Sequence, residues 1–476
     1  MRVCLICEGC YPYVPGGVSG WIQMLCSAFE DIEFVVWSVA TTREEMSTFS
    51  YKLPANVKAV HTLYLGDEQF QKGHKRIVLS PAEKEVLKDL MIGSTERVDW
   101  VRTLELIKKY RRHMSDILMS ESFFEICREE YQRQGSKKIF QQFLWNLRGI
   151  YFPLMYILSG EIPQADLYHA VSTGYAGIMG SCASYVGKKP FLLTEHGIYT
   201  REREEDIIRS QWVAGEFKEI WIDFFKKLSY IAYRQANVVT SLFETNKSLQ
   251  LELGCPEEKI VIIPNGVEAQ EYSVLERKRE ASDGVFLIGT VLRVVPIKDV
   301  KTMLLAFDIV KQAVPEAQLK IMGNDKENPA YYKECLELLE ELGTRDVEFM
   351  GLVNVKEYLA DMDLLLLSSI SEGQPLAMLE GMAAGIPYVA TNVGNCKAML
   401  EGEAGDTLGP AGLVVPVMNS EAMADAIIRC IRDPKLRRRM GEAGRKRVEH
   451  SYSRKVMLDR FHSLYESLGG GSKWQG

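Results

Sequence analysis

Two cations follow a predicted strand in the second half of the chain and could bind phosphate. Arg293 and Lys298 stand five residues apart, directly after the apolar run at residues 285–290. A guanidinium offers a planar fork of donors and an ammonium a compact charge, and both suit the oxygens of a diphosphate. A solvated turn that carries two ordinary surface cations is an equally simple interpretation, and these two residues leave both open.

Two carboxylates follow another strongly apolar run, at residues 364–368. Glu372 falls on the loop after this predicted strand, and Glu380 lies eight residues later on a helix predicted at 376–384. Open α/β sheets bind ligands outside the carboxyl ends of their strands, and carboxylates accept hydrogen bonds from hydroxyl groups. The pair therefore fits the hydroxyls of a sugar nucleotide, whereas helix capping and surface acids are the competing interpretation.

Two adjacent glycines, Gly16 and Gly17, separate a strand predicted at 2–7 from a helix predicted at 19–30. Bare backbone N–H groups at a helix N-terminus suit a phosphate, and glycine lets a ligand approach the backbone. The spacing does not match G-x-G-x-x-G, so a dinucleotide fingerprint is not predicted. A simple tight turn is the alternative for this loop.

The ten cysteines show no spacing typical of a secreted, disulfide-bonded domain, which favours a reducing compartment. Cys4, Cys7 and Cys10 do have the spacing of metal ligands. On a strand, positions three apart point to opposite faces, so Cys4 and Cys7 cannot easily share one ion. We therefore predict that these cysteines are small buried hydrophobic residues and that the chain has no metal site.

The elements that position these residues are predicted to form two α/β domains. Strand, glycine loop, helix and strand open the chain in the order of a doubly wound domain. The turn residues Pro264, Asn265 and Gly266 predict a hinge close behind them, and five βα units after it predict a second parallel sheet. The predicted domains are 1–267, with a mostly helical insertion at about 41–160 and a returning helix at 452–470, and 268–451.

Bulk composition limits the classes of function. The 476 residues are 46% hydrophobic and 25% charged, as in ordinary globular proteins. A net charge of −7 argues against a strongly basic groove, so we expect no nucleic-acid partner. We find neither a secretory signal nor the run of about 20 apolar residues that a membrane span needs. We therefore expect a cytoplasmic protein.

The order and spacing of these residues resemble a known enzyme family. The chain resembles the retaining GT-B glycosyltransferases of family 4 in three features. These are the E-x7-E pattern of Glu372 and Glu380, the following Gly385-Ile386-Pro387, and the spacing of five between Arg293 and Lys298. Many members carry a more polar turn than residues 294–297 do here. The segments 6–21 and 194–202 resemble more narrowly the PelF family, the cytosolic glycosyltransferases of the bacterial Pel exopolysaccharide system. The resemblance implies a GT-B fold, in which two Rossmann-like domains face each other across a cleft.

The resemblance also implies roles for individual residues. Gly16 and Gly17 would lie near the donor phosphate and the acceptor, Arg293 and Lys298 would stabilise the departing diphosphate, Glu372 would contact the donor sugar and Glu380 the ribose. His196, which follows a strand predicted at 190–194, would sit beside the transferred sugar. The predicted catalytic residues are His196, Arg293, Lys298 and Glu372. The predicted donor-binding residues are Gly16, Gly17, Asn265, Arg293, Lys298, Glu372, Gly373, Gln374, Pro375, Leu376 and Glu380.

The activity that follows is transfer of a hexose or N-acetylhexosamine from a UDP-sugar to a growing exopolysaccharide. The resemblance implies retention of configuration by front-face attack, without a protein nucleophile, and we expect no metal cofactor. Expected partners are UDP, the UDP-sugar, a polysaccharide acceptor and inner-membrane components of a Pel synthase, which would recruit the protein to the membrane. A phosphorylase, an epimerase, or a non-catalytic UDP-binding regulatory subunit on the same fold are the alternatives. Glucose, N-acetylglucosamine and N-acetylgalactosamine all stay open as the transferred sugar.

Overall fold

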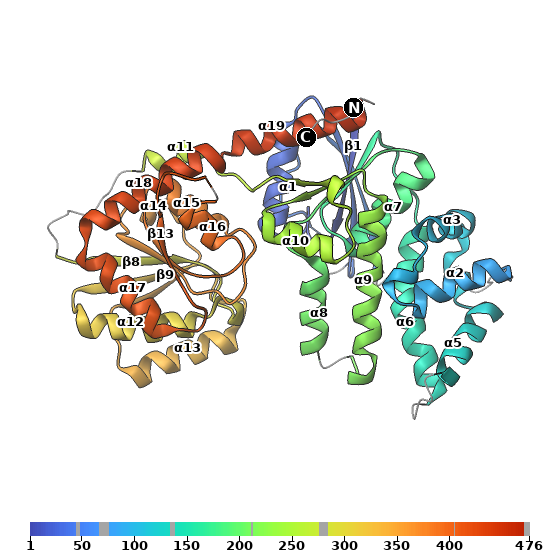
Figure 1. The fold of residues 1–476 in the computed structure, drawn as a ribbon, viewed down its shortest axis with the longest axis horizontal. Coiled ribbons are helices and arrows are strands. Elements are labelled where there is room, and N and C mark those ends of the chain that lie inside the picture. Colours follow the sequence, from blue (N-terminus) through green and yellow to red (C-terminus); the bar gives the residue numbers. More distant parts are fainter. Residues whose placement is uncertain are drawn as a thin grey trace. The chain divides into compact units, whose positions relative to one another are not determined.

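The computed structural model describes residues 1–43, 48–65, 76–133, 139–210, 213–275, 284–403 and 405–470. The chain divides into two compact units (Figure 1). The first unit comprises Met1–Ile263 and Arg460–Gly476, and the second comprises Pro264–Asp459. Each unit is built on its own parallel sheet, and the prediction of two Rossmann-like α/β domains is confirmed.

The sheet of the first unit has seven strands in the order β3-β2-β1-β4-β5-β6-β7, and every neighbouring pair is parallel. Its short inner strands are completely buried, as the apolar runs in the sequence predict. The strands are β1 (Arg2–Glu8), β2 (Glu33–Ala40), β3 (Val57–Tyr64), β4 (Leu167–Ala170), β5 (Phe191–Thr194), β6 (Val238–Ser241) and β7 (Ile260–Ile262).

Helices cover both faces of this sheet. On one face, Cys4 and Ile6 of β1 pack in the same core cluster as Met179. On the other, Phe29 and Phe34 contact the ring of Tyr465, at centroid distances of 5.8 and 6.3 Å. Apart from the helices at residues 81–159, the α-helices described in this unit are α1 (Gly17–Ala28), α7 (Gly174–Gly187), α8 (Tyr199–Arg209), α9 (Lys218–Gln235), α10 (Glu244–Glu252) and the end of α19 (Arg454–Gly469).

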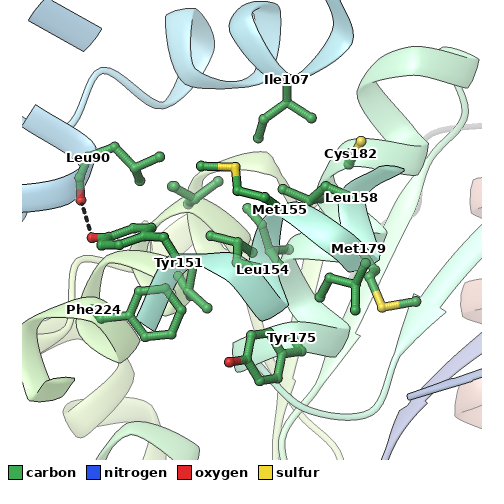
Figure 2. Close-up of a cluster of buried hydrophobic side chains, with 14 of the residues drawn as sticks. Leu90, Ile107, Tyr151, Leu154, Met155, Leu158, Tyr175, Met179, Cys182 and Phe224 are labelled. Carbon is green, nitrogen blue, oxygen red and sulfur yellow. Dashed lines mark hydrogen bonds between the residues drawn. The ribbon is translucent and has the colours of Figure 1, made fainter. Parts of the chain in front are cut away.

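Residues 81–159 form a helical subdomain on the first unit. Its helices are α2 (Pro81–Ile92), α3 (Trp100–Tyr110), α4 (Met114–Ile117), α5 (Glu121–Arg133) and α6 (Phe140–Ser159). Figure 2 shows the apolar side chains of α6 lying among those of α2, α3, α7 and α9. The buried hydroxyl of Tyr151 donates to the carbonyl of Leu90 at 2.8 Å, so this polar group is satisfied inside the apolar contact.

Strand β3 also falls within the range that the sequence predicts to be mostly helical. It pairs in parallel with β2 and ends the sheet on that side. Its residues alternate irregularly between half-buried and exposed, because an edge strand has a neighbour on one side only. This weak pattern explains why the strand is not evident from the sequence.

The second unit has a six-stranded sheet in the order β10-β9-β8-β11-β12-β13, again with parallel neighbours only. Its strands are β8 (Phe286–Val291), β9 (Ala317–Met322), β10 (Val347–Gly351), β11 (Leu364–Leu367), β12 (Tyr388–Thr391) and β13 (Gly412–Val415). Two separate core clusters flank the sheet, one with α12, α13 and α17 and the other with α11, α15, α16 and α18. The helices are α11 (Ala269–Ser273), α12 (Val300–Ala313), α13 (Pro329–Leu342), α14 (Lys356–Leu359), α15 (Leu376–Ala383), α16 (Cys396–Glu401), α17 (Ser420–Arg432) and α18 (Pro434–Ser451).

Among the helices in the described part of the chain, none combines the length and apolar character needed to cross a membrane.

Candidate functional site

The strand order places the predicted site loops of the second unit at one point of its sheet. Strands β8 and β11 are neighbours, and the direction in which successive strands are added reverses between them. Ligands of open α/β sheets bind outside the carboxyl ends of the strands at such a reversal. Residues 292–299 follow β8, and residues 368–375 follow β11, so both loops leave this edge of the sheet.

Lys298 and Glu372 connect these two loops. Lys298 Nζ donates to Glu372 Oε1 at 2.5 Å, and Ser369 Oγ donates to the same carboxylate oxygen at 2.6 Å. The side chains of Lys298 and Glu372 are 16% and 12% exposed. The structure therefore brings together a predicted phosphate ligand and a predicted sugar ligand, with little solvent between them to screen the charges.

Main-chain contacts fix the position of Lys298. Its carbonyl accepts a hydrogen bond of 2.7 Å from Ser368 Oγ, and the amide of Ile370 donates to the carbonyl of Ile297 at 2.9 Å. Asp299 then adopts a left-handed conformation with φ 45° and caps α12 by accepting from the amide of Thr302. The turn that carries Lys298 is thus tied both to the loop after β11 and to the start of a helix.

The loop that carries Glu372 depends on a glycine outside the predicted site. Gly394 has a φ of 50°, and a Cβ there would lie 2.1 Å from the carbonyl oxygen of Glu372 and 2.4 Å from that of Gly373. The amide of Asn395 donates to the same Gly373 oxygen at 2.9 Å. Only glycine fits this approach. No local pattern in the sequence indicates this role, because Gly394 lies 21 residues after Gly373 in the chain.

Gln374 and Asn265 form a second contact between predicted site residues. The amide of Asn265 donates to Gln374 Oε1 at 2.7 Å, and both residues are buried. Gln374 Nε2 is also buried and has no hydrogen-bond partner within the described residues, so it is a donor available to a ligand. Gly373, Pro375 and Leu376 are half-buried around it, where the loop enters α15.

Arg293 stands apart from this pair. Its side chain is 58% exposed, and Nη1 lies 2.6 Å from Glu327 Oε1. An exposed ion pair of this kind contributes little to stability, typically about 0–1 kcal/mol. The guanidinium is therefore free to leave Glu327 for a more strongly charged ligand.

Glu380 belongs to a different cluster of charged residues. Burial raises its pKa, and a hydrogen bond from the hydroxyl of Tyr272 acts in the opposite direction. Glu271, next to this tyrosine, pairs with Lys356 at 2.5 Å and with Arg454 at 3.3 Å. The structure thus shows that Tyr272 holds Glu380 through a contact that sequence reasoning missed.

The glycine loop of the first unit leaves backbone groups uncovered. Gly16 and Gly17 are exposed, and α1 has no side-chain cap at its start. A Cβ at either position would meet nothing within 4 Å, so packing does not require glycine here. The amide of Gly16 donates to the hydroxyl of Tyr51 at 3.3 Å. What the two glycines provide is access to the backbone of the first helical turn.

His196 lies on the loop after β5 and carries a neutral imidazole. Burial lowers its pKa to about 4. The ring of Trp21 packs edge-on against it, with the centroids 4.7 Å apart. His196 Nε2 is buried and has no hydrogen-bond partner within the described ranges. A neutral imidazole with one free nitrogen can accept or donate a single hydrogen bond to a ligand.

The reversal point of the first sheet, between β1 and β4, contains a carboxylate that the sequence did not single out. Glu8 ends β1 and accepts from the amide of Tyr175 at 2.9 Å and from the hydroxyl of Tyr199 at 2.6 Å. Tyr175 is the second residue of α7, so Glu8 occupies the N-terminus of that helix. Burial raises the pKa of Glu8, against these hydrogen bonds.

The cysteine prediction is correct for two of the three residues near the N-terminus. Cys4 and Cys7 are fully buried, whereas Cys10 is not, because the chain has already left the strand at Gly9. Among the described residues, no three His, Cys, Asp or Glu side chains gather closely enough to hold a metal ion.

Comparison with protein families extends this picture. Residues 1–258 match the family described as Domain of unknown function (DUF3492). The chain belongs to this DUF3492 family. Residues 273–447, almost all of the second unit, match the family Glycosyl transferases group 1. The first unit thus matches DUF3492, and the second unit is similar to group 1 glycosyltransferases.

Curated relatives are distant and match part of the chain. N-acetyl-alpha-D-glucosaminyl L-malate synthase of Bacillus anthracis is 28% identical over 238 residues, which are 48% of this chain and 60% of that enzyme. The capsular polysaccharide biosynthesis glycosyltransferase CapM of Staphylococcus aureus is 23% identical over 311 residues, or 62% of this chain and 75% of CapM. The alignment with the first of these relatives therefore spans less than two thirds of its length.

A solved structure matches over nearly the whole chain. Anabaena HepE, crystallised in complex with UDP, superimposes with a TM-score of 0.61 at 15% identity, covering 98% of this chain and all of HepE. At this identity the likeness concerns the fold alone. It confirms the predicted GT-B class of two parallel-sheet α/β domains.

Proposed function

We propose that the protein is a retaining glycosyltransferase that moves a hexose or N-acetylhexosamine from a UDP-sugar to a growing exopolysaccharide. The observation that carries this proposal is the Lys298–Glu372 pair, held at 2.5 Å where the loops after β8 and β11 leave the sheet. One member offers a positive charge to a diphosphate, and the other accepts hydrogen bonds from sugar hydroxyls. The match of this unit to group 1 glycosyltransferases supports the same assignment.

In this proposal, Lys298 acts on the bond that breaks. As the bond between the sugar and the β-phosphate opens, negative charge develops on the departing UDP. A partly buried ammonium stabilises that charge much more than one in bulk water. Arg293 adds a second cation by exchanging Glu327 for phosphate oxygens. With two cations in place, we propose that transfer needs no divalent metal ion.

The other predicted residues bind and orient the donor. We propose that Glu380, held by Tyr272, accepts hydrogen bonds from the ribose, and that the unpaired Nε2 of Gln374 donates to the nucleotide sugar. His196 is proposed to hydrogen-bond the transferred sugar through its free Nε2 as a neutral group. Its lowered pKa would keep it uncharged throughout the neutral range.

The donor class is tested by isothermal titration with UDP, GDP and ADP, with and without EDTA. UDP should bind to the wild type in both buffers, and Arg293→Ala/Lys298→Ala should abolish binding. Lys333→Ala/Lys397→Ala is the matched control, because it removes the same charge from two exposed positions, 77% and 60% exposed, in the same unit. Preferential binding of GDP or ADP, or loss of UDP binding in EDTA, would contradict the proposal.

For the acceptor, we propose a Pel-type exopolysaccharide and membership of the PelF family, with inner-membrane synthase components as partners. The relatives named for polysaccharide biosynthesis support the polysaccharide part of this proposal. Incubation with UDP-glucose, UDP-N-acetylglucosamine and UDP-N-acetylgalactosamine, with and without oligosaccharide acceptors, tests it. Acceptor-dependent UDP release with a lengthened product is expected. Free sugar or an epimerised product would indicate a different enzyme, and UDP binding without turnover would indicate a regulatory subunit.

A further inference from the structure

Two thiols meet at the end of β1, at a motif that the proposed function does not use. Cys7 lies on the strand and Cys10 follows the turn at Gly9, whose φ of 62° reverses the chain. The side chains of Cys7 and Cys10 are hydrogen-bonded to each other. The C-x-x-C spacing and the turn at Gly9 therefore bring the two thiols next to each other.

The two thiols differ in access. Cys7 is completely buried, and Cys10 alone among the ten cysteines, all of them within the described residues, is not buried. Cys10 is therefore the more accessible of the two thiols. This is the arrangement of an attacking thiol and a resolving thiol.

We propose that Cys7 and Cys10 are a redox-active dithiol that reacts with low-molecular-weight disulfides and closes to an intramolecular disulfide. The Cys10 thiolate attacks one sulfur of the small disulfide, forms a mixed disulfide and releases one thiolate. The Cys7 sulfur then attacks the Cys10 sulfur, releases the second small thiolate and passes its proton to it. In total the protein loses two protons and two electrons, and the small disulfide becomes two thiols.

Local electrostatics favour this order of attack. The hydrogen bond from Cys7 lowers the pKa of Cys10, and the backbone amide of Tyr11 acts in the same direction, against burial. The same contact with Cys10, together with burial, raises the pKa of Cys7 well above its usual value. The thiolate thus forms on the accessible sulfur, which is the one that must react first.

The position of the pair links it to the glycine loop. The carbonyl of Cys10 accepts hydrogen bonds from the amides of Tyr13 and Val14, at 2.9 and 3.0 Å. Cys10 is thus the start of the turn that leads to Gly16 and Gly17. A disulfide to Cys7 would fasten this turn to β1. The proposal itself concerns thiol chemistry and does not depend on the transferase activity.

The test uses the full-length reduced protein, oxidised glutathione as the oxidant, and peptide mass spectrometry after alkylation of the remaining thiols. In the wild type, two of the ten thiols should become resistant to alkylation, with Cys7 linked to Cys10 and no glutathione retained. Cys7→Ser should keep one glutathione on Cys10, because the resolving thiol is missing. Cys10→Ser should react at neither position.

Cys26→Ser is the matched control. Cys26 lies on α1, is buried near Cys7, and should not be needed for the reaction with glutathione. It should behave as the wild type does. The proposal is overturned if the wild type keeps glutathione on Cys10 while Cys7 stays free, if Cys7 links to Cys26, or if all ten thiols remain open to alkylation. Circular dichroism checks the fold of each variant, and the wild-type result decides even if a variant does not fold.

Discussion

The two units have the same strand-order reversal but fill it with different chemistry. Between β1 and β4 of the first sheet, Glu8 occupies the N-terminus of α7 and His196 nearby is neutral. Between β8 and β11 of the second sheet, Lys298 and Glu372 present a charged pair. In the first unit, the carboxylate of Glu8 already accepts a hydrogen bond at the N-terminus of α7, so an anion there would be repelled. In the second unit, Lys298 is a cation that an incoming anion can bind. The strand order shows where a ligand can bind in each unit, and the charged residues at that point determine which of the two sheets binds a diphosphate.

The largest expected effect is that of Lys298→Ala on transfer. Removing this charge takes away a stabilising group at the leaving diphosphate and leaves the carboxylate of Glu372 without its cation. Loss of one such group typically costs about 10²–10³-fold in kcat. Initial rates of UDP release from the preferred UDP-sugar measure the effect. Lys301→Ala, in an exposed pair with Glu334, is the matched control and should stay near wild type; equal losses in both variants would contradict the specific role of Lys298.

A second prediction concerns acid stability of the first unit. Burial lowers the pKa of His196 from 6.5 to about 4, so between these values the unfolded chain binds more protons than the folded one. The free energy of unfolding is therefore highest above pH 6.5 and decreases as the pH falls toward 4. His196 accounts for a decrease on the order of 3 kcal/mol.

Urea unfolding followed by tryptophan fluorescence reports this effect selectively, since the tryptophans among the described residues all belong to the first unit. In His196→Asn, the free energy of unfolding should change less between pH 7 and pH 5 than it does in the wild type. The exposed control His61→Asn should behave as the wild type does. An unchanged slope in His196→Asn would show that the imidazole is not buried as described.

Glu8→Ala should destabilise the first unit without changing nucleotide affinity. The substitution leaves the amide of Tyr175 and the hydroxyl of Tyr199 without their acceptor, and unsatisfied buried groups cost about 1–3 kcal/mol. The midpoint of tryptophan-detected unfolding should fall relative to the exposed control Glu30→Ala. A large loss of UDP binding in Glu8→Ala would place the diphosphate at the first edge instead.

Tyr272→Phe tests how Glu380 is held. The change removes one hydroxyl that bonds to this carboxylate, which is worth about 0.5–1.5 kcal/mol and corresponds to roughly a two- to thirteenfold loss of UDP affinity. Calorimetric titration measures it, with Tyr332→Phe on α13 as the control. If UDP binds to Tyr272→Phe as it does to the wild type, Glu380 does not contact the nucleotide through this arrangement.

The smallest effect on stability is expected for Gly17→Ala. A Cβ there meets nothing within 4 Å, so the free energy of unfolding should change by no more than about 1 kcal/mol. If a ligand approaches the bare backbone of this turn, activity should nevertheless fall. Loss of stability together with activity would show instead that glycine is needed for folding.

The sequence allowed the prediction of those parts that follow from local pattern. Strand β11 is a run of four buried leucines, and its following loop carries Glu372, so both could be located. Strands β3 and β13 could not, because both are partly buried strands at the edge of their sheets, and β13 also begins with glycine. The amphipathic helices α17 and α18 also went unassigned, in a stretch rich in charge.

The contacts that hold the site residues in place could not be predicted from the sequence, for a different reason. Glu8 and Tyr199 are 191 residues apart in the chain, and Tyr272 and Glu380 are brought together only by packing of α11 on α15. No local pattern encodes such pairs. The E-x7-E motif could indicate which carboxylates bind a ligand. The structure was needed to show which contacts hold these carboxylates in position.

Hydrogen exchange of the wild-type protein with and without UDP tests the central claim most directly, since it reports on both edges in one experiment. The account predicts that UDP slows exchange in residues 292–299 and 368–376 of the second unit and leaves residues 171–176 of the first unchanged. Protection confined to residues 9–20 and 171–176, with the loops after β8 and β11 unaffected, would contradict it.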